Sequence, residues 1–146
     1  MDDTSTTIAL GLQLIIAAGL VAAMTVIHSL GLFGISKLLR LEDDRLLKHE
    51  MNASAIGLLA SFGLLLFGLH IAEILIFAAF YLGVGGMETF EEAIFYSASA
   101  YATLGWTAEY FPRDWRLIGA LEALIGFILI GWSTAFMVST MRKITE

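Results

Sequence analysis

Residues 83–102 of this 146-residue chain read GVGGMETFEEAIFYSASAYA, and this stretch decides which kind of fold the chain adopts. The glycines of Gly83–Gly86 interrupt an apolar helix, and Thr89 with Glu92 forms the pattern of a capping box, which starts a new helix. That helix, predicted over about residues 90–102, is apolar but shorter than the roughly 20 residues needed to cross a bilayer. Non-helical chain at membrane depth must be buried in protein or line a wet cavity. One small chain cannot enclose such a cavity, so the sequence predicts a re-entrant loop in an oligomer.

Long apolar segments stand on both sides of this stretch. Residues 4–36 contain no Asp, Glu, Lys or Arg, and residues 51–82 and 117–141 form two further apolar segments. Each is long enough for a membrane-spanning helix. A polar stretch of mixed charge, residues 37–50, separates the first two segments. The predicted fold class is therefore an all-α membrane protein with three transmembrane helices and one re-entrant helix.

The composition agrees with a membrane location and excludes several kinds of function. Hydrophobic residues make up 58% of the chain, more than a soluble domain of this size can bury. The mean hydropathy is +0.82. The chain has no cysteine, which excludes disulfides and thiolate chemistry, and its formal charge of -6 argues against a nucleic-acid partner. No Ser-His-Asp arrangement is present, so we expect no enzyme activity and no organic cofactor.

The basic residues predict the orientation of the chain. Cytoplasmic loops retain Lys and Arg, whereas acids count for little in this rule. Six of the eight basic residues fall between the first two spans or after the third: Lys37, Arg40, Arg45, Lys48, Arg142 and Lys143. The amino terminus has no basic start, so it does not look like a cleaved signal peptide. We therefore expect a multi-pass protein of the cell membrane with its amino terminus outside and its carboxyl terminus in the cytoplasm.

Residues 93–108, AIFYSASAYATLGWTA, resemble the pore helix and selectivity filter of potassium channels. In that family a Thr-Val/Leu-Gly-Tyr-Gly-Asp strip follows a short aromatic-rich helix. Residues 111–126, FPRDWRLIGALEALIG, resemble the outer turret and inner helix of small bacterial channels, and the match runs without gaps over about residues 93–135. The resemblance implies an extra N-terminal span (residues 1–36), a cytoplasmic loop (37–50) and a pore module (51–146). Within the pore module, the outer helix would cover residues 51–82, the pore helix about 90–102, the filter 103–108 and the inner helix about 117–141.

The same resemblance implies a homotetrameric cation channel whose partners are its own copies, membrane lipids and monovalent cations. In such a filter, rings of backbone carbonyls replace the water around the ion. The filter residues would be Thr103, Leu104, Gly105, Trp106 and Thr107, with a K⁺ or Na⁺ ion bound at Thr103, Leu104 and Gly105. The residues that support the filter would be Phe95, Tyr96, Ser99 and Glu109, with Trp106 packed on the first two.

Two departures from the family pattern affect the expected selectivity. The second filter glycine is replaced by Thr107, where the family's backbone angles cost a residue with a Cβ roughly 1–2 kcal/mol. The family aspartate and the glutamate of the short helix are replaced by Ala108 and Ser99, so the usual carboxylate pair is missing. We expect the inner carbonyl rings to survive and the channel to discriminate only weakly between K⁺ and Na⁺.

The third apolar segment carries the residues expected to line the cavity and to gate it. A stripe at three- and four-residue spacing faces the cavity by resemblance: Phe127, Ile130, Thr134 and Val138. Gly126 matches the family's hinge glycine, because glycine absorbs the dihedral change of a bending helix. The alternative is that Gly126 only permits close packing of helices.

Ionisable residues inside the apolar segments suggest other functions. His70 and Glu73 share one helix face, Glu122 lies near the start of the third segment, and His28 lies in the first. Such groups mark a site for a proton or a metal ion by default. We prefer the plainer interpretation that they hydrogen-bond between helices. Two alternatives to the channel remain: a proton- or metal-coupled transporter that uses His70, Glu73 and Glu122, and a non-conducting accessory membrane protein with a decayed filter.

Overall fold

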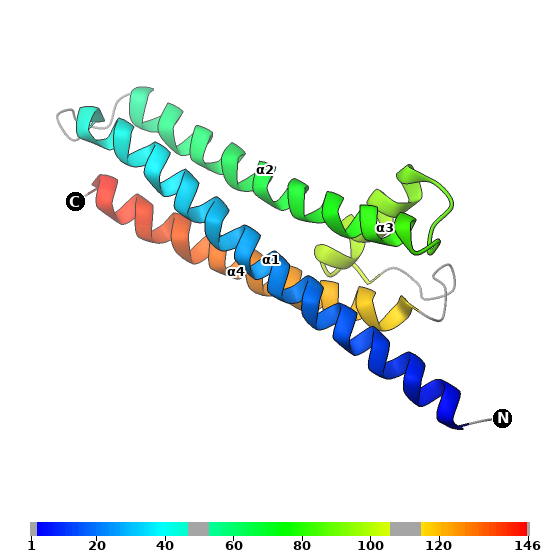
Figure 1. Cartoon of the computed structure of the whole chain (residues 1–146). Helices are drawn as coiled ribbons and strands as arrows, with labels where there is room; N and C mark the ends of the chain where they lie inside the picture. Colours follow the sequence, from blue (N-terminus) through cyan, green and yellow to red (C-terminus); the bar gives the residue numbers. More distant parts are fainter. Residues whose placement is uncertain (1–2, 47–52, 106–114, 146) are drawn as a thin grey trace.

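A computed structural model of the chain describes residues 3–46, 53–105 and 115–145. In these ranges the chain forms four helices and no strand: α1 (Asp3–Leu46), α2 (Ala53–Gly83), α3 (Phe90–Tyr101) and α4 (Arg116–Thr145). Helices α1, α2 and α4 run alongside one another, and the short helix α3 lies between α2 and α4 at one end of the bundle (Figure 1). The predicted all-α fold is confirmed.

Three of the helices are long and apolar enough to cross a membrane. Their candidate spans are Leu10–Leu38, Ile56–Gly83 and Arg116–Arg142. Successive spans run in opposite directions, so the amino terminus lies at the same end as α3 and the carboxyl terminus lies at the opposite end (Figure 1). The chain is a multi-pass membrane protein, as the sequence predicts.

Helix α1 continues beyond the carboxyl-terminal end of the first predicted span, residues 1–36. It begins at Asp3 and continues to Leu46, so most of the segment assigned to a cytoplasmic loop is helical. Residues 37–46 read KLLRLEDDRL and contain neither glycine nor proline. Leucine, lysine, arginine and glutamate are among the best helix formers, so nothing in this stretch ends the helix.

The start of α3 follows the predicted capping box. The Thr89 hydroxyl accepts the Glu92 amide N–H at 3.2 Å, and the Glu92 carboxylate accepts the Thr89 amide N–H at 3.2 Å. Gly85 stands in the left-handed region at φ +67°, in the turn between α2 and α3. Helix α3 has 12 residues and is therefore about 18 Å long, too short to cross a bilayer.

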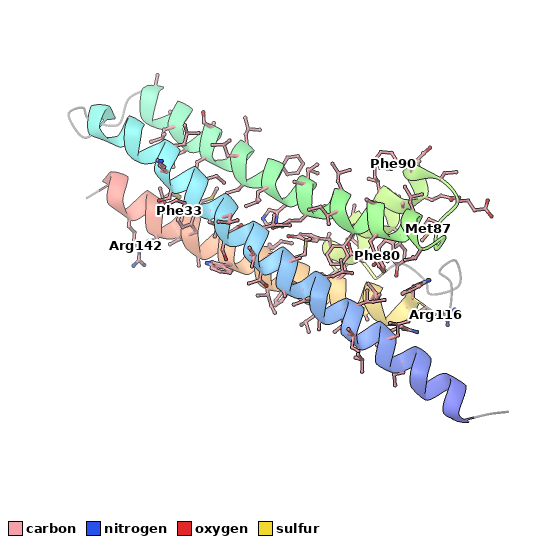
Figure 2. The ribbon with its side chains drawn as sticks, viewed as in Figure 1. Phe33, Phe80, Met87, Phe90, Arg116 and Arg142 are labelled. Atoms are coloured by element: carbon pink, nitrogen blue, oxygen red, sulfur yellow. The ribbon has the colours of Figure 1, made fainter. Side chains whose placement is uncertain are left out.

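Two apolar clusters hold the helices together. The one nearer α3 contains eight buried residues from all four helices: Ala17, Met24, Phe77, Tyr81, Tyr101, Ile118, Ile125 and Leu129. The one nearer the carboxyl terminus joins α1 and α2 and is packed against by α4: Leu32, Ile35, Leu58, Phe62 and Leu66. Other apolar side chains, such as Phe33 and Phe90, are 69% and 57% exposed on the outer faces of the bundle (Figure 2).

Candidate pore loop and buried histidine cluster

A buried carboxylate on α4 forms a hydrogen bond with helix α3. Glu122 is fully buried, and one of its oxygens accepts a hydrogen bond from the Tyr81 hydroxyl of α2. The Ser97 hydroxyl of α3 lies 2.5 Å from the other oxygen and 2.9 Å from the Ile74 carbonyl oxygen. One carboxylate thus joins α2, α3 and α4.

A second buried carboxylate holds the carboxyl-terminal end of α3. Glu73 of α2 is fully buried and accepts a hydrogen bond from the Tyr101 hydroxyl. Ser99, which replaces the glutamate of the potassium-channel pattern, instead donates within its own helix to the Phe95 carbonyl at 2.7 Å. Two carboxylates that brace α3 therefore come from the spanning helices α2 and α4.

The two tyrosines of α3 act as neutral hydroxyl groups. Burial is the largest cause that raises the pKa of Tyr101 well above its ordinary value, and the hydrogen bond to Glu73 raises it further. Burial, followed by the nearby Glu122 carboxylate, raises the pKa of Tyr96 to about 12. Tyr96 packs edge-on against Tyr81 with 5.2 Å between ring centroids. Both tyrosines therefore keep their protons at neutral pH.

Two glycines of α4 let α3 approach closely. A Cβ built on Gly126 would lie 2.5 Å from the Tyr101 carbonyl oxygen and 3.0 Å from the Tyr101 Cα, closer than atoms normally pack. A Cβ on Gly119 would meet the Tyr96 hydroxyl, whereas a Cβ on Gly131 would meet nothing within 4 Å. Of the two interpretations of Gly126, the geometry favours close helix packing.

Helix α3 ends in a left-handed turn at the start of the predicted filter. The Thr103 N–H bonds to the Ala100 carbonyl and the Leu104 N–H bonds to the Ser99 carbonyl, both at 2.9 Å, which is the Schellman pattern. Thr103 takes φ +57° and Gly105 takes φ +67°. Left-handed angles are unusual for a β-branched residue and often mark functional segments. The predicted filter and support residues Trp106, Thr107 and Glu109 lie outside the described residues.

The strain at Thr103 gives a testable expectation. Replacing Thr103 by glycine should stabilise the folded protein by about 1 kcal/mol, because glycine lacks the Cβ that disfavours left-handed angles. Replacing it by alanine removes the hydroxyl but keeps the strain, so Thr103→Ala is the matched control and should give no gain. Denaturant unfolding of purified protein in detergent measures both. Equal stability of the two variants would show that Thr103 is not strained.

The predicted cavity stripe is not covered by the chain's own helices. Phe127, Ile130 and Val138 are 67%, 39% and 47% exposed, and Thr134 is also exposed. Leu104, in the predicted filter, is 76% exposed, and Phe95 on α3 is 53% exposed. These side chains therefore remain available to lipid, to a cavity or to other subunits.

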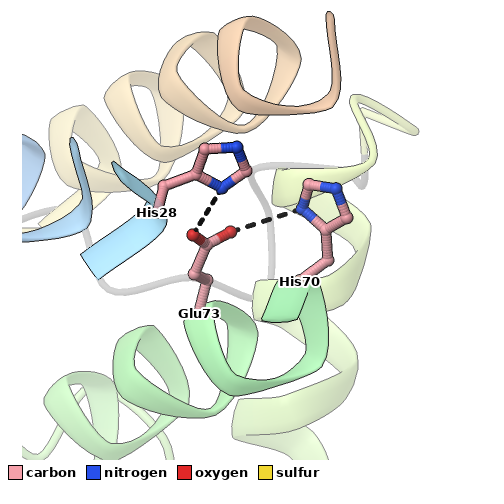
Figure 3. Close-up of side chains that lie close together, drawn as sticks. All are labelled: His28, His70 and Glu73. Atoms are coloured by element: carbon pink, nitrogen blue, oxygen red, sulfur yellow. Dashed lines mark hydrogen bonds and ion pairs between the residues drawn. The ribbon is translucent and has the colours of Figure 1, made fainter. Parts of the chain in front are cut away.

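A histidine cluster lies between α1 and α2, beside the end of α3 (Figure 3). His28 Nδ1 of α1 lies 2.9 Å from one oxygen of Glu73, and His70 Nδ1 of α2 lies 3.3 Å from the other. The His70 Nδ1 is also 2.8 Å from the Tyr101 hydroxyl, and His28 Nε2 is 3.3 Å from the Ser133 hydroxyl of α4. The cluster thus links all three spanning helices to the end of α3.

The cluster lies between the two apolar clusters, about halfway along the spans. His28 and Glu73 are fully buried, and the His70 side chain is 17% exposed. Of the residues proposed from the sequence, His70 and Glu73 come together as expected. Glu122 instead bonds to Tyr81 and Ser97, and His28 takes the third place in the group.

The positions of His28 and Glu73 along the chain carry a signal for their contact. His28 and Glu73 lie almost equally far along the chain from residue 50, in the middle of the segment that connects α1 and α2. In two antiparallel helices joined by a short connection, residues equidistant from the connection lie at the same level. Counting outward from the connection would have paired His28 with Glu73.

No protein-family model, curated protein or solved structure matches this chain.

Proposed function

We propose that this chain is one subunit of a homotetrameric channel that conducts monovalent cations, K⁺ or Na⁺, down their gradient. The observation that carries the proposal is the depth at which α3 ends. Tyr101 contacts Glu73 and Gly126, which lie ten residues from the ends of their spans at Gly83 and Arg116. Both residues also lie within four residues of the middle of their spans, which is about 5 Å along the helix axis. In the proposed arrangement the chain therefore stops being helical close to the middle of the membrane.

Non-helical backbone at that depth requires a particular environment. Peptide groups in the bilayer core must be satisfied by protein or by water in a cavity. Residues 103–105 are exposed in the single chain, so its own helices do not cover this segment. Other copies placed around an axis would cover its outer side and leave its carbonyl oxygens to face an ion path.

The electrostatics of α3 favour a cation at this position. The carboxyl-terminal end of a helix carries a partial negative charge. In the proposed tetramer four such ends approach the axis at the midplane, just inside the filter formed by Thr103, Leu104, Gly105 and Trp106. The exposed stripe of Phe127, Ile130, Thr134 and Val138 then lines the cavity below it. The amino terminus and the α2–α3 connection face outward, and the carboxyl terminus is cytoplasmic.

A reversal potential measured under bi-ionic conditions tests the conduction and its selectivity. Purified protein in a planar bilayer, with K⁺ on one side and Na⁺ on the other, should conduct with a reversal potential close to zero. The double substitution Thr107→Gly with Ala108→Asp should restore the family filter pattern and shift the potential toward that of K⁺. A matched control is Gly68→Ala on α2, where an added Cβ would meet nothing within 4 Å. A strongly K⁺-selective wild type would contradict the weak discrimination that we expect.

The same preparation separates the channel from its two alternatives. A coupled transporter would move cations only when a proton or metal gradient is supplied, and the buried His28, His70 and Glu73 group is the feature in its favour. An accessory protein with a decayed filter would give no flux at all. Gradient-driven cation flux without a coupled ion supports the channel; either other result overturns it.

A further inference from the structure

We propose that His28, His70 and Glu73 bind one divalent transition-metal ion of the zinc class inside the membrane domain. The site would join α1, whose role is otherwise unexplained, to α2 and to the end of α3. Metal binding at this site does not depend on whether the protein conducts ions.

The donor atoms are of the right kind and close together. Imidazole nitrogens and a carboxylate oxygen are the donors of three-residue zinc sites that keep a fourth position open. Here the three donor atoms all lie within 4.8 Å of one another. In a tetrahedral zinc site the donors stand roughly 3.4 Å apart. The His28 and His70 nitrogens lie 2.9 and 3.3 Å from Glu73. The widest pair therefore needs to close by at most about 1.4 Å, within the reach of side-chain rotation.

Both histidines turn the same nitrogen toward the carboxylate. The Nδ1 atoms of His28 and His70 each face a different oxygen of the Glu73 carboxylate, so an ion placed among the three side chains would meet three donors at once (Figure 3). Metal-bound histidines usually make a hydrogen bond with their other nitrogen. The Nε2 of His28 has such a partner in the Ser133 hydroxyl at 3.3 Å. A hydroxyl both donates and accepts, so Ser133 serves His28 whether its Nε2 carries a proton or not.

The charge around Glu73 also favours a cation. Its hydrogen-bond and ion-pair partners in the described part of the chain are His28, His70 and Tyr101, with no Lys or Arg among them. A buried carboxylate in a membrane needs a compensating partner. A divalent ion would supply the positive charge. The Tyr101 hydroxyl lies 2.8 Å from His70 Nδ1, next to the proposed site.

Binding of an ion at this site would affect the predicted filter through Tyr101. An ion that takes the Glu73 oxygens weakens the hydrogen bond from Tyr101, whose backbone packs on Gly126. Tyr101 stands two residues before Thr103, where the left-handed turn begins. The ion would thus change the position of the segment that follows α3.

Metal titration of the purified protein in detergent tests the site directly. After treatment with a chelator, the protein is titrated with Co²⁺, which gives intense visible absorption when it is four-coordinate, and Zn²⁺ is then added to displace it. We expect one Co²⁺ to bind per chain and one Zn²⁺ per chain to displace it. His70→Ala and His28→Ala should each weaken Zn²⁺ binding by more than about 10-fold, because loss of even a supporting group costs 10- to 100-fold.

Two controls separate this site from adventitious binding. His49→Ala removes the chain's third histidine, and Glu122→Gln alters the other buried carboxylate, which bonds to Tyr81 and Ser97 instead. Both variants should bind Zn²⁺ like the wild type. If His28→Ala does not fold, His70→Ala decides the question, since its side chain is only partly buried.

The outcomes are distinct from those of the conduction experiment. The metal-site proposal fails if no stoichiometric Zn²⁺ binding is found at a metal concentration of about 100 µM, or if only His49→Ala loses binding. Neither result bears on the channel proposal. If the protein binds the metal but gives no ionic current, the metal-site proposal stands and the channel proposal fails.

Discussion

Replacing Gly126 by alanine is expected to lower the unfolding free energy by about 2–3 kcal/mol, because the added methyl group would collide with the backbone of Tyr101. The neighbouring atoms are a main-chain oxygen and a Cα rather than the tip of a flexible side chain. Relief therefore requires α3 and α4 to move apart. That movement would also shift the start of the predicted filter, so conduction should fall together with stability.

Gly131→Ala is the matched control for this prediction. It places the same methyl group on the same helix, about one and a half turns further on, where nothing lies within 4 Å. Its effect on stability should stay within about 0.5 kcal/mol. Unfolding in mixed micelles, followed by circular dichroism, measures both variants. Should Gly126→Ala keep full stability while altering only channel opening, Gly126 would be a hinge and not a packing site.

The features predicted well from the sequence are those that depend on local composition and spacing. The three apolar segments became the three candidate spans, because lipid demands long uninterrupted helices. The Thr89–Glu92 capping box formed as expected, since its hydrogen bonds join residues only three apart. Residues 37–46, the first part of the predicted cytoplasmic loop, continue α1, because charge alone does not end a helix made of good helix formers.

The features that were missed depend on contacts between distant residues. The sequence shows two carboxylates absent from the places where the potassium-channel pattern has them, and it gives no local sign that Glu73 and Glu122 support α3 instead. Gly126 was left between two roles, because only the position of Tyr101 distinguishes a hinge from a close contact. His28 has no ionisable neighbour nearby in the first apolar segment, and its contact with Glu73 forms because α1 packs against α2.

Replacing Glu122 by leucine is expected to be the most damaging change to the contacts of α3 at Ser97. Hydrogen bonds between membrane helices average about 0.6 kcal/mol and reach about 1.7 kcal/mol. Glu122 should lie at the upper end of this range, because it is fully buried and takes hydroxyl donors from two other helices. Losing both contacts should lower the unfolding free energy by about 3 kcal/mol.

A double-mutant cycle isolates one of these contacts. Glu122→Leu, Tyr81→Phe and the double variant should show a coupling free energy of about 1.5 kcal/mol, since each single change already removes the same hydrogen bond. Ser61→Ala is a suitable control, because Ser61 is also on α2 but its hydroxyl bonds within its own helix at 2.8 Å. Ser61→Ala and Glu122→Leu should add within about 0.5 kcal/mol.

The cycle also bears on how the short helix is held at depth. If the coupling between Tyr81 and Glu122 is absent, the carboxylate does not fix α3 against α2 and α4, and apolar packing alone must do so. In that case Gly126→Ala would still destabilise the protein, whereas Glu122→Leu would leave conduction unchanged. If the coupling is present, stability and conduction should fall in parallel in Glu122→Leu. That result would mean that hydrogen bonds of the buried Glu122, and not only the packing of the helices, determine where α3 ends near the centre of the membrane.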